Sequence, residues 1–380
     1  MAEISCSVTK KLDNNTENFH KCKGIRDNCY QRARRVVPEP IYFEMLYSLF
    51  ARNNLFILLT LTLRHSVRYR KEKGREKMKV IPVRSDSVYK KIMEAPFEKK
   101  NDIYRYEMMM PFEKKWACYS VPMKASTPNG YDVIMASGIL GHIAPTKVDE
   151  SQRANIKVLS SDNLWNDCEL SIKNSLNCFI DNGVELPVQD YLFTILLANA
   201  ESPYITMNEG YCGDGGIPGY IFSWLVPNEY TLKHLPVALA HEVNHNVRFQ
   251  FIRWKNDITL GEMMVSEGLA ENFATYIYGE DKAGPWVTKT DMQTLNEYIK
   301  PIIHDGLGVQ GLENLNAYLY GDEMATLQNY PTVGLPYCAG YACGYHLVKY
   351  YLKNTGKSIV EATLLPASEI LEVAEDFWND

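Results

Sequence analysis

Long hydrophobic runs are missing from this sequence of 380 residues. Its most apolar run extends from Leu55 to Leu63, whereas about 20 residues are needed to cross the core of a bilayer. Arg52 and Arg64 flank the run, and no small-residue cleavage site follows it, which argues against a secretory signal peptide. We therefore expect a soluble protein; the alternative for this run is an interfacial or single-span anchor.

Cysteine is sparse, and several common motifs are absent. The nine cysteines are odd in number and lack the paired spacing of zinc fingers, so we expect a reduced, cytoplasmic protein. No segment ends in the Gly-Lys-Ser/Thr of a phosphate loop or fits a dinucleotide fingerprint. The net charge of −6 argues against a nucleic-acid partner, and a hydrophobic content of 46% excludes global disorder.

The charge is distributed unevenly along the chain. Residues 1–77 contain 16 Lys and Arg but only 8 Asp and Glu, a net of +8, which leaves −14 for residues 78–380. We expect the first segment to be a basic, poorly structured extension rather than a domain. Residues 73–77 have codons that can spell a bacterial ribosome-binding sequence, and the pattern of residue types changes at Met78. Our hypothesis is therefore that the native protein starts at Met78.

Hydrophobic patterning indicates an α+β protein with a small sheet followed by a helical half. Helical spacing prevails between residues 85 and 185, with Ser161 as an N-cap and Gly183 as a stop. Three later segments favour strands, namely Asp190–Ala198, Tyr204–Met207 and Gly219–Val226. We therefore divide the remainder of the chain into a mostly helical region, residues 78–185, and a second region, residues 186–380.

Four glycines between residues 210 and 216 separate the last two expected strands. The simplest interpretation is a flexible turn, because glycine adopts the backbone conformations that tight turns require. The alternative is a loop that roofs a substrate cleft.

Residues 241–245 read His-Glu-Val-Asn-His. Two histidines four residues apart project from the same face of a helix, so His241 and His245 can bind one metal ion. Glu242 then points toward the open side of the metal, where it can take a proton from an activated water molecule. The pattern predicts a catalytic zinc site with Glu242 as the general base.

The surroundings of this motif strengthen the prediction. Residues 237–240 form an apolar, helix-compatible run, and Pro236 lies near the expected start of the helix, where proline is tolerated. Val243, Asn244 and Asn246 are uncharged, so the helix can be buried around its ligands. The alternative is an amphipathic helix with ordinary polar residues.

Catalytic zinc needs a third protein ligand and one open position. Glu267 follows His245 by 22 residues and can supply that ligand. Glu271 lies one helical turn further and can accept the other ring N–H of a ligand histidine. A solvated surface face would explain an ordinary pair of glutamates, but this segment is largely apolar, and buried carboxylates need a partner such as a metal.

These residues resemble the gluzincin clan of zinc metallopeptidases. The sequence is most similar to a bacterial family described as predicted zinc-dependent proteases and built around a domain of unknown function. The resemblance covers roughly residues 78–380, which supports a start at Met78 and makes residues 186–380 the catalytic region. It implies zinc ligation by His241, His245 and Glu267, with Glu242 as the base. Well-studied gluzincins commonly have Asp where this chain has Glu271.

The resemblance also implies a substrate-binding strand. In gluzincins, the strand before the active-site helix typically pairs with the substrate backbone as an edge strand, and Gly219–Val226 occupies that place. Main-chain pairing provides affinity, and side pockets provide specificity. The substrate-contacting residues would then be Gly219, Tyr220, Ile221 and Phe222; the alternative is an ordinary core strand.

A tyrosine stripe marks the expected C-terminal helix. Tyr337, Tyr341 and Tyr345 recur every four residues, and Gly340 and Gly344 permit a close helix approach. Zinc peptidases often use a Tyr or His to hold the developing oxyanion. Tyr345 and His346 are our first candidates for this role, with Tyr341 as a third. The alternative is an aromatic packing stripe.

Together these features predict a cytoplasmic zinc metallopeptidase that holds one Zn²⁺ per chain and hydrolyses a peptide or protein substrate. A related alternative is hydrolysis of a non-peptide amide. A different class would be a metal-stabilised binding or regulatory protein without turnover. The intact Glu242 argues against the last class, because a structural metal site needs ligands but no base.

Overall fold

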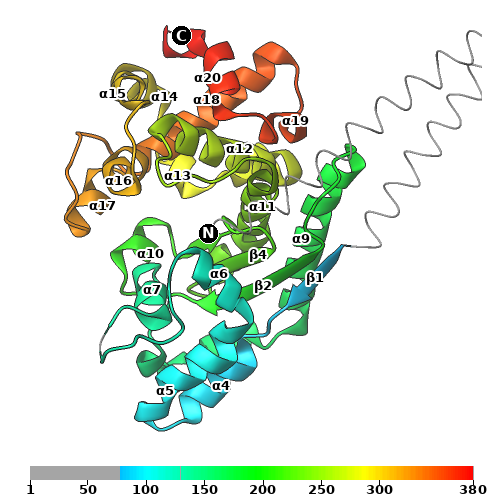
Figure 1. Cartoon of the computed structure of the whole chain (residues 1–380), viewed down its shortest axis with the longest axis vertical. Helices are drawn as coiled ribbons and strands as arrows, with labels where there is room; N and C mark the ends of the chain where they lie inside the picture. Colours follow the sequence, from blue (N-terminus) through cyan, green and yellow to red (C-terminus); the bar gives the residue numbers. More distant parts are fainter. Residues whose placement is uncertain (1–77, 129, 380) are drawn as a thin grey trace, which may run out of the picture. The chain divides into compact units, whose positions relative to one another are not determined.

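A computed structural model describes residues 78–128 and 130–379 of the protein. The predictions for residues 1–77, including the run Leu55–Leu63 and the start at Met78, lie outside the described residues. The α+β class is confirmed, because one small sheet lies among many helices (Figure 1). Within residues 78–128 and 130–379, no helix combines the length and the apolar character needed to cross a membrane.

The sheet has four strands in the order β1-β2-β4-β3. β1 (Lys79–Pro82), β2 (Asp190–Leu197) and β4 (Tyr220–Leu225) are parallel, whereas β3 (Tyr211–Asp214) runs antiparallel to β4. Because β1 pairs with β2, the expected regions 78–185 and 186–380 share one sheet. β3 is an edge strand, and β4 lies inside the sheet.

Helices fill the chain between the first two strands, as the sequence predicts. Ser161 is the N-cap of the longest of them, although its side chain accepts no capping hydrogen bond, and Gly183 follows that helix with a φ of 86°. The helices are α4 (Asp86–Glu94), α5 (Phe97–Ile103), α6 (Glu113–Cys118), α7 (Val133–Ile139), α8 (Arg153–Leu159) and α9 (Asp162–Asp181).

Two predictions around the glycine-rich segment were wrong in detail. Tyr204–Met207 was expected to be a strand, but it belongs to the short helix α10 (Pro203–Met207), where Pro203 occupies a first-turn position that needs no N–H. Conversely, the expected turn contains the edge strand β3. Strand propensity does not predict β3, because its segment is rich in glycine and glycine is depleted in strands.

The helix that carries the histidine motif is longer than expected. α11 (Glu229–Phe251) begins with a capping box, in which the Asn228 side chain accepts from Thr231 N and the Thr231 side chain bonds back to Asn228 N. Pro236 therefore lies inside the helix rather than at its start. The side chain of Ser171 on α9 donates to the Pro236 carbonyl at 2.8 Å, which helps fasten the helix to α9.

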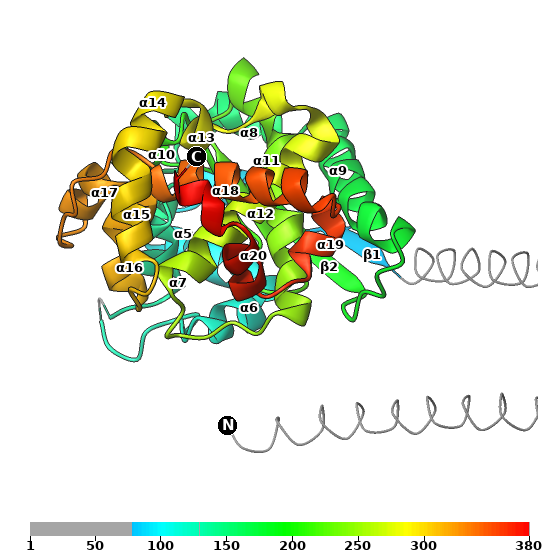
Figure 2. The ribbon, with the colours of Figure 1, turned by 90° about the horizontal axis from the view of Figure 1, so that it is seen from above.

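A second buried helix, α12 (Leu260–Tyr278), packs against α11 and against α18 (Ala339–Thr355). Figure 2 shows α18 lying across α12. The crossing is very close, because a Cβ atom at Gly268 would lie 2.1 Å from the Gly344 carbonyl oxygen. A Cβ at Gly344 would in turn lie 2.2 Å from the Met264 carbonyl oxygen. The glycine at 344 therefore permits the close approach that the sequence suggested.

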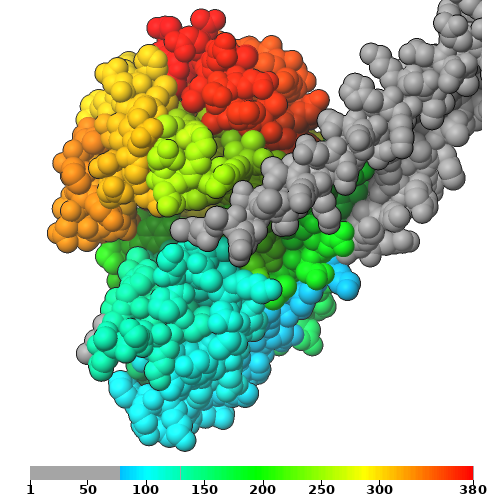
Figure 3. Space-filling view, viewed as in Figure 1, coloured from blue at the N-terminus to red at the C-terminus, as the bar shows by residue number. Residues whose placement is uncertain are grey.

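The remaining helices form a C-terminal layer. The space-filling view places these yellow-to-red residues on one side and the cyan residues of α4–α7 on the other (Figure 3). Besides α12 and α18, the layer contains α13 (Pro285–Thr288), α14 (Met292–Thr294), α15 (Lys300–Gly306), α16 (Leu312–Tyr320), α17 (Asp322–Leu327), α19 (Ile359–Thr363) and α20 (Ala367–Val373).

Candidate metal centre

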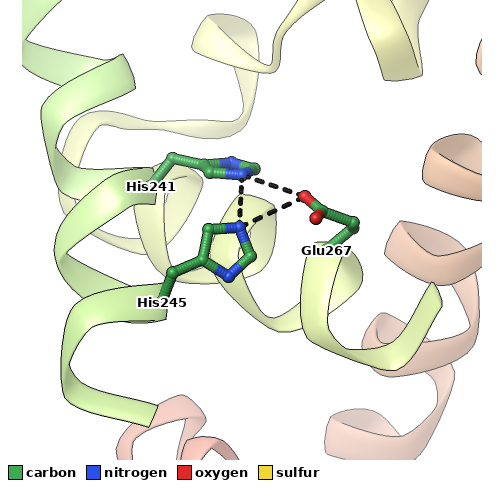
Figure 4. Close-up of side chains that lie close together, drawn as sticks. All are labelled: His241, His245 and Glu267. Carbon is green, nitrogen blue, oxygen red and sulfur yellow. Dashed lines mark hydrogen bonds and ion pairs between the residues drawn. The ribbon is translucent and has the colours of Figure 1, made fainter. Parts of the chain in front are cut away.

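Three side chains from α11 and α12 converge on one point (Figure 4). His241 Nε2 and His245 Nε2 lie 3.1 Å apart, and Glu267 Oε2 lies 3.3 Å and 3.2 Å from them, respectively. All three residues are buried. The structure therefore groups the three ligands that the sequence predicts.

The spacing of these atoms fits zinc. Two ligand atoms about 2.0–2.1 Å from a tetrahedral zinc ion would be about 3.3 Å apart, close to the 3.1–3.3 Å separations in this triangle. Two imidazoles and one carboxylate are also the ligand set of many catalytic zinc sites, which keep a fourth position open. Within residues 78–128 and 130–379, this is the group of His, Cys, Asp and Glu side chains that could hold a metal.

In both His241 and His245, the Nδ1 atom, which is not part of the ligand triangle, contacts a neighbouring side chain. His241 Nδ1 donates to Glu271 Oε2 at 2.8 Å, which leaves the Nε2 lone pair directed at the centre. His245 Nδ1 lies 3.3 Å from Ser266 Oγ. Such partners fix the tautomer of a ligand histidine and raise its basicity. The predicted role of Glu271 fits this geometry, whereas Ser266 was not singled out from the sequence.

Glu242 is held beside the centre by the glycine-rich segment. The backbone N–H of Gly215 donates to Glu242 Oε2 at 2.6 Å. Burial raises the pKa of Glu242, and the nearby imidazoles of His241 and His245 only partly offset this effect. A raised pKa suits a general base that must also return its proton. For Glu267, burial acts in the same direction, but the neighbouring histidines hold its pKa at about 2.

Glycine is required where this segment crosses Glu242. A Cβ atom at Gly215 would lie 2.1 Å from the Glu242 carbonyl oxygen, whereas a Cβ at Gly216 would have its nearest neighbour, Tyr119 Oη, at 3.4 Å. We expect Gly215→Ala to lower the free energy of unfolding by about 1–3 kcal/mol, because backbone must move to relieve the overlap. Gly216→Ala is the matched control and should stay near wild type in thermal denaturation. Equal stability of both variants would contradict the close contact.

The three ligands and Glu242 line a cleft with a volume of about 860 Å³. Its walls include Gly213, Gly215 and Gly216 of the glycine-rich segment. The segment therefore borders the cleft, in agreement with the alternative interpretation of its sequence. Pockets of this size are typical of sites that enclose small molecules or parts of a peptide.

The first two oxyanion candidates do not face this cleft. Tyr345 and His346 are absent from its lining; the Tyr345 ring packs near Lys349, and burial together with nearby lysines lowers the pKa of His346 to about 4. Tyr341, one turn earlier on α18, does line the cleft. Burial, and then the nearby Glu267 carboxylate, raise the pKa of Tyr341 well above its usual value, so its hydroxyl stays protonated.

The predicted substrate strand also needs correction. β4 pairs with β2 on one side and with β3 on the other, so most of its backbone is already bonded. Beyond the end of β3, the Asn246 side chain accepts from Gly219 N at 2.9 Å and donates to the Tyr220 carbonyl at 2.9 Å. The backbone of Gly219–Phe222 is therefore not free to bind a substrate strand, and the alternative of a core strand holds.

One buried ion pair beside the cleft has no counterpart in our sequence predictions. Lys115 is fully buried and bonds to Asp214 at the end of β3, whose carboxylate also accepts from Tyr119 Oη at 3.0 Å and from Gly216 N at 3.1 Å. Burial would raise the pKa of Asp214, but Lys115 reverses this and lowers it. The pair anchors the backbone that holds Glu242. Because 99 residues separate its members, no local pattern points to it.

Comparisons with known proteins identify the family of this chain. A model of the family DUF2268, described as "Predicted Zn-dependent protease", matches residues 164–372, a range that contains both helices of the metal centre. The uncharacterized protein YjfC of Bacillus subtilis (strain 168) is 35% identical over 295 residues, which cover 77% of this chain and 97% of that protein. No solved structure matches the chain significantly. The chain belongs to the DUF2268 family of predicted Zn-dependent proteases.

Proposed function

We propose that this protein is a gluzincin-type zinc metallopeptidase that hydrolyses peptide bonds. The observation that carries the proposal is the arrangement of a zinc-sized ligand triangle with a buried, unligated carboxylate, Glu242, in the wall of the same cleft. A purely structural zinc site has four protein ligands and no base. The direct test is to load the protein with zinc, incubate it with a mixed peptide library and identify new termini by mass spectrometry.

His241, His245 and Glu267 would hold the zinc ion. When bound, zinc acts as a Lewis acid that activates water and polarises the carbonyl group under attack. Glu242 accepts the proton of the attacking water at its carboxylate and then donates it to the leaving amine. The N–H of Gly215 keeps this carboxylate in position between the two steps.

Among residues 78–128 and 130–379, one edge of β3 pairs with no other strand, and this edge lies beside Glu242. Val226 N donates to the Gly210 carbonyl at 2.8 Å, and bonding alternates along an antiparallel pair, so Gly213 directs its N–H and C=O away from β4. A Cβ at Gly213 would lie 2.3 Å from Glu242 Oε1, which places this edge against the base. We therefore propose that an extended substrate pairs with β3 at Gly213.

Tyr341 is the proposed oxyanion donor. Tyr341→Phe should lower turnover by about 100-fold or more, because one preorganised hydroxyl donor is lost. The matched control is Tyr345→Phe, which removes the same atom from the same helix outside the cleft and should retain near-normal turnover. Steady-state kinetics on a peptide identified from the library would measure both. A larger defect in the Tyr345→Phe protein would reverse the assignment.

We also propose a cytoplasmic location. In the part of the chain that the structure describes, Cys118, Cys168, Cys178, Cys212, Cys338 and Cys343 are all free thiols. Free thiols are typical of reducing compartments. A peptide or protein substrate would then come from that compartment.

A further inference from the structure

Trp286, on α13, borders the cleft but directs its indole N–H toward the interior. The Nε1 atom donates to Glu271 Oε2 at 2.8 Å. Its ring packs against Tyr211 and His241, with centroid separations of 5.5 Å and 5.9 Å. The residue therefore contacts both a ligand imidazole and the carboxylate that orients it.

Glu271 is only 1% exposed, and three N–H groups surround its carboxylate. His241 Nδ1 and Trp286 Nε1 both donate to Oε2, while the backbone N–H of Gly284 donates to Oε1 at 2.6 Å. A buried carboxylate needs such donors to hold one orientation. Two of the three come from the segment 284–286, so this segment determines where the acceptor of the His241 proton lies.

We propose that Trp286 is a positioning residue for the metal centre, acting through Glu271 on the His241 imidazole. The proposal rests on the zinc site of the proposed function, but it does not require catalytic turnover. Without the indole donor, Oε2 keeps a single partner, and the carboxylate can rotate about its Gly284 contact. His241 Nε2 would then lose its fixed direction toward the other two ligands, and the zinc affinity would fall.

The first measurement is the dissociation constant for zinc, by competition with a chelator, in Trp286→Phe and wild type. Loss of a partner that orients a metal ligand typically weakens metal binding about 10- to 100-fold, and we expect about 10-fold here, because Gly284 and His241 still bond to Glu271. Phenylalanine keeps most of the aromatic wall. Replacement of Trp286 by 3-benzothienylalanine exchanges the N–H for sulfur at nearly the same shape and should weaken zinc binding equally. This second variant tests the proposal even if the Trp286→Phe protein folds poorly.

A matched control tests whether loss of any buried indole hydrogen bond would have the same effect. Trp165 is 2% exposed, donates from Nε1 to the Leu159 carbonyl at 2.7 Å and lies outside the cleft lining. Trp165→Phe should lower thermal stability and leave the zinc dissociation constant unchanged. Equal weakening of zinc binding in Trp165→Phe and Trp286→Phe would overturn the proposal.

A double-mutant cycle tests the route through Glu271. Glu271→Ala should weaken zinc binding by itself, and adding Trp286→Phe to it should have little further effect, because the acceptor on which the indole acts is gone. Additive effects of the two substitutions would contradict the route. An unchanged zinc affinity in both Trp286 variants would overturn the proposal while leaving the zinc site intact, whereas a wild-type protein that binds no zinc would overturn both.

Discussion

Glu242→Gln should lower the turnover of peptide substrates by at least about 100-fold, the usual contribution of a positioned general base. Zinc content and thermal stability should stay close to wild type. The reason is that the glutamine carbonyl can still accept from Gly215 N, while the amide has no basicity to take the proton from water. The measurement is cleavage of a mixed peptide library by zinc-loaded wild type and variant, followed by mass spectrometry.

Glu372→Gln, the same chemical change at an exposed position of α20, is the control for this experiment and should cleave like wild type. Equal cleavage by the Glu242→Gln protein would point to contamination or to a different active site. No cleavage by wild type, with zinc bound and a broad library, would favour a regulatory or binding protein on the same scaffold. Cleavage of non-peptide amides alone would favour the related hydrolase.

His245→Ala should reduce zinc from one ion per chain to almost none and abolish turnover. Only His241 Nε2 and Glu267 Oε2 would remain in the triangle, and two protein ligands do not replace the three of a catalytic zinc site. Elemental analysis of the protein after dialysis measures the stoichiometry. Glu267→Ala should also weaken zinc binding strongly, because it removes the ligand atom 3.2 Å from His245 Nε2.

His234→Ala serves as the control for histidine loss. His234 lies on the same helix, two turns before His241, and its Nδ1 contacts the Tyr230 carbonyl rather than the metal centre. This variant should keep its zinc and its turnover. Full zinc occupancy in the His245→Ala protein would refute the proposed centre.

The proposed metal ligands could be identified from the sequence because the relevant spacing is helical. Residues four positions apart share one face of a helix, so His241 and His245 converge whatever the rest of the fold does. The same rule places Glu271 one turn from Glu267, and it does so within an apolar segment that marks a buried helix. The α+β class followed similarly, from local patterns of apolar residues in β2, β4 and the flanking helices.

The tertiary structure decided which neighbouring elements complete the site. Tyr341 and Tyr345 belong to the same four-residue repeat of tyrosines, so the sequence does not distinguish them. They lie about 6 Å apart along the helix. The position at which α18 packs against α12 therefore decides which of the two lines the cleft. The order of the strands also cannot be predicted from local sequence. β4 has the stronger strand propensity, yet the glycine-rich β3 is the edge strand beside it. Two further contacts join segments that are distant in sequence, namely Lys115 with Asp214 and Trp286 with Glu271. These segments come together only when the whole sheet packs with its helices, so no periodicity within either segment predicts the contacts.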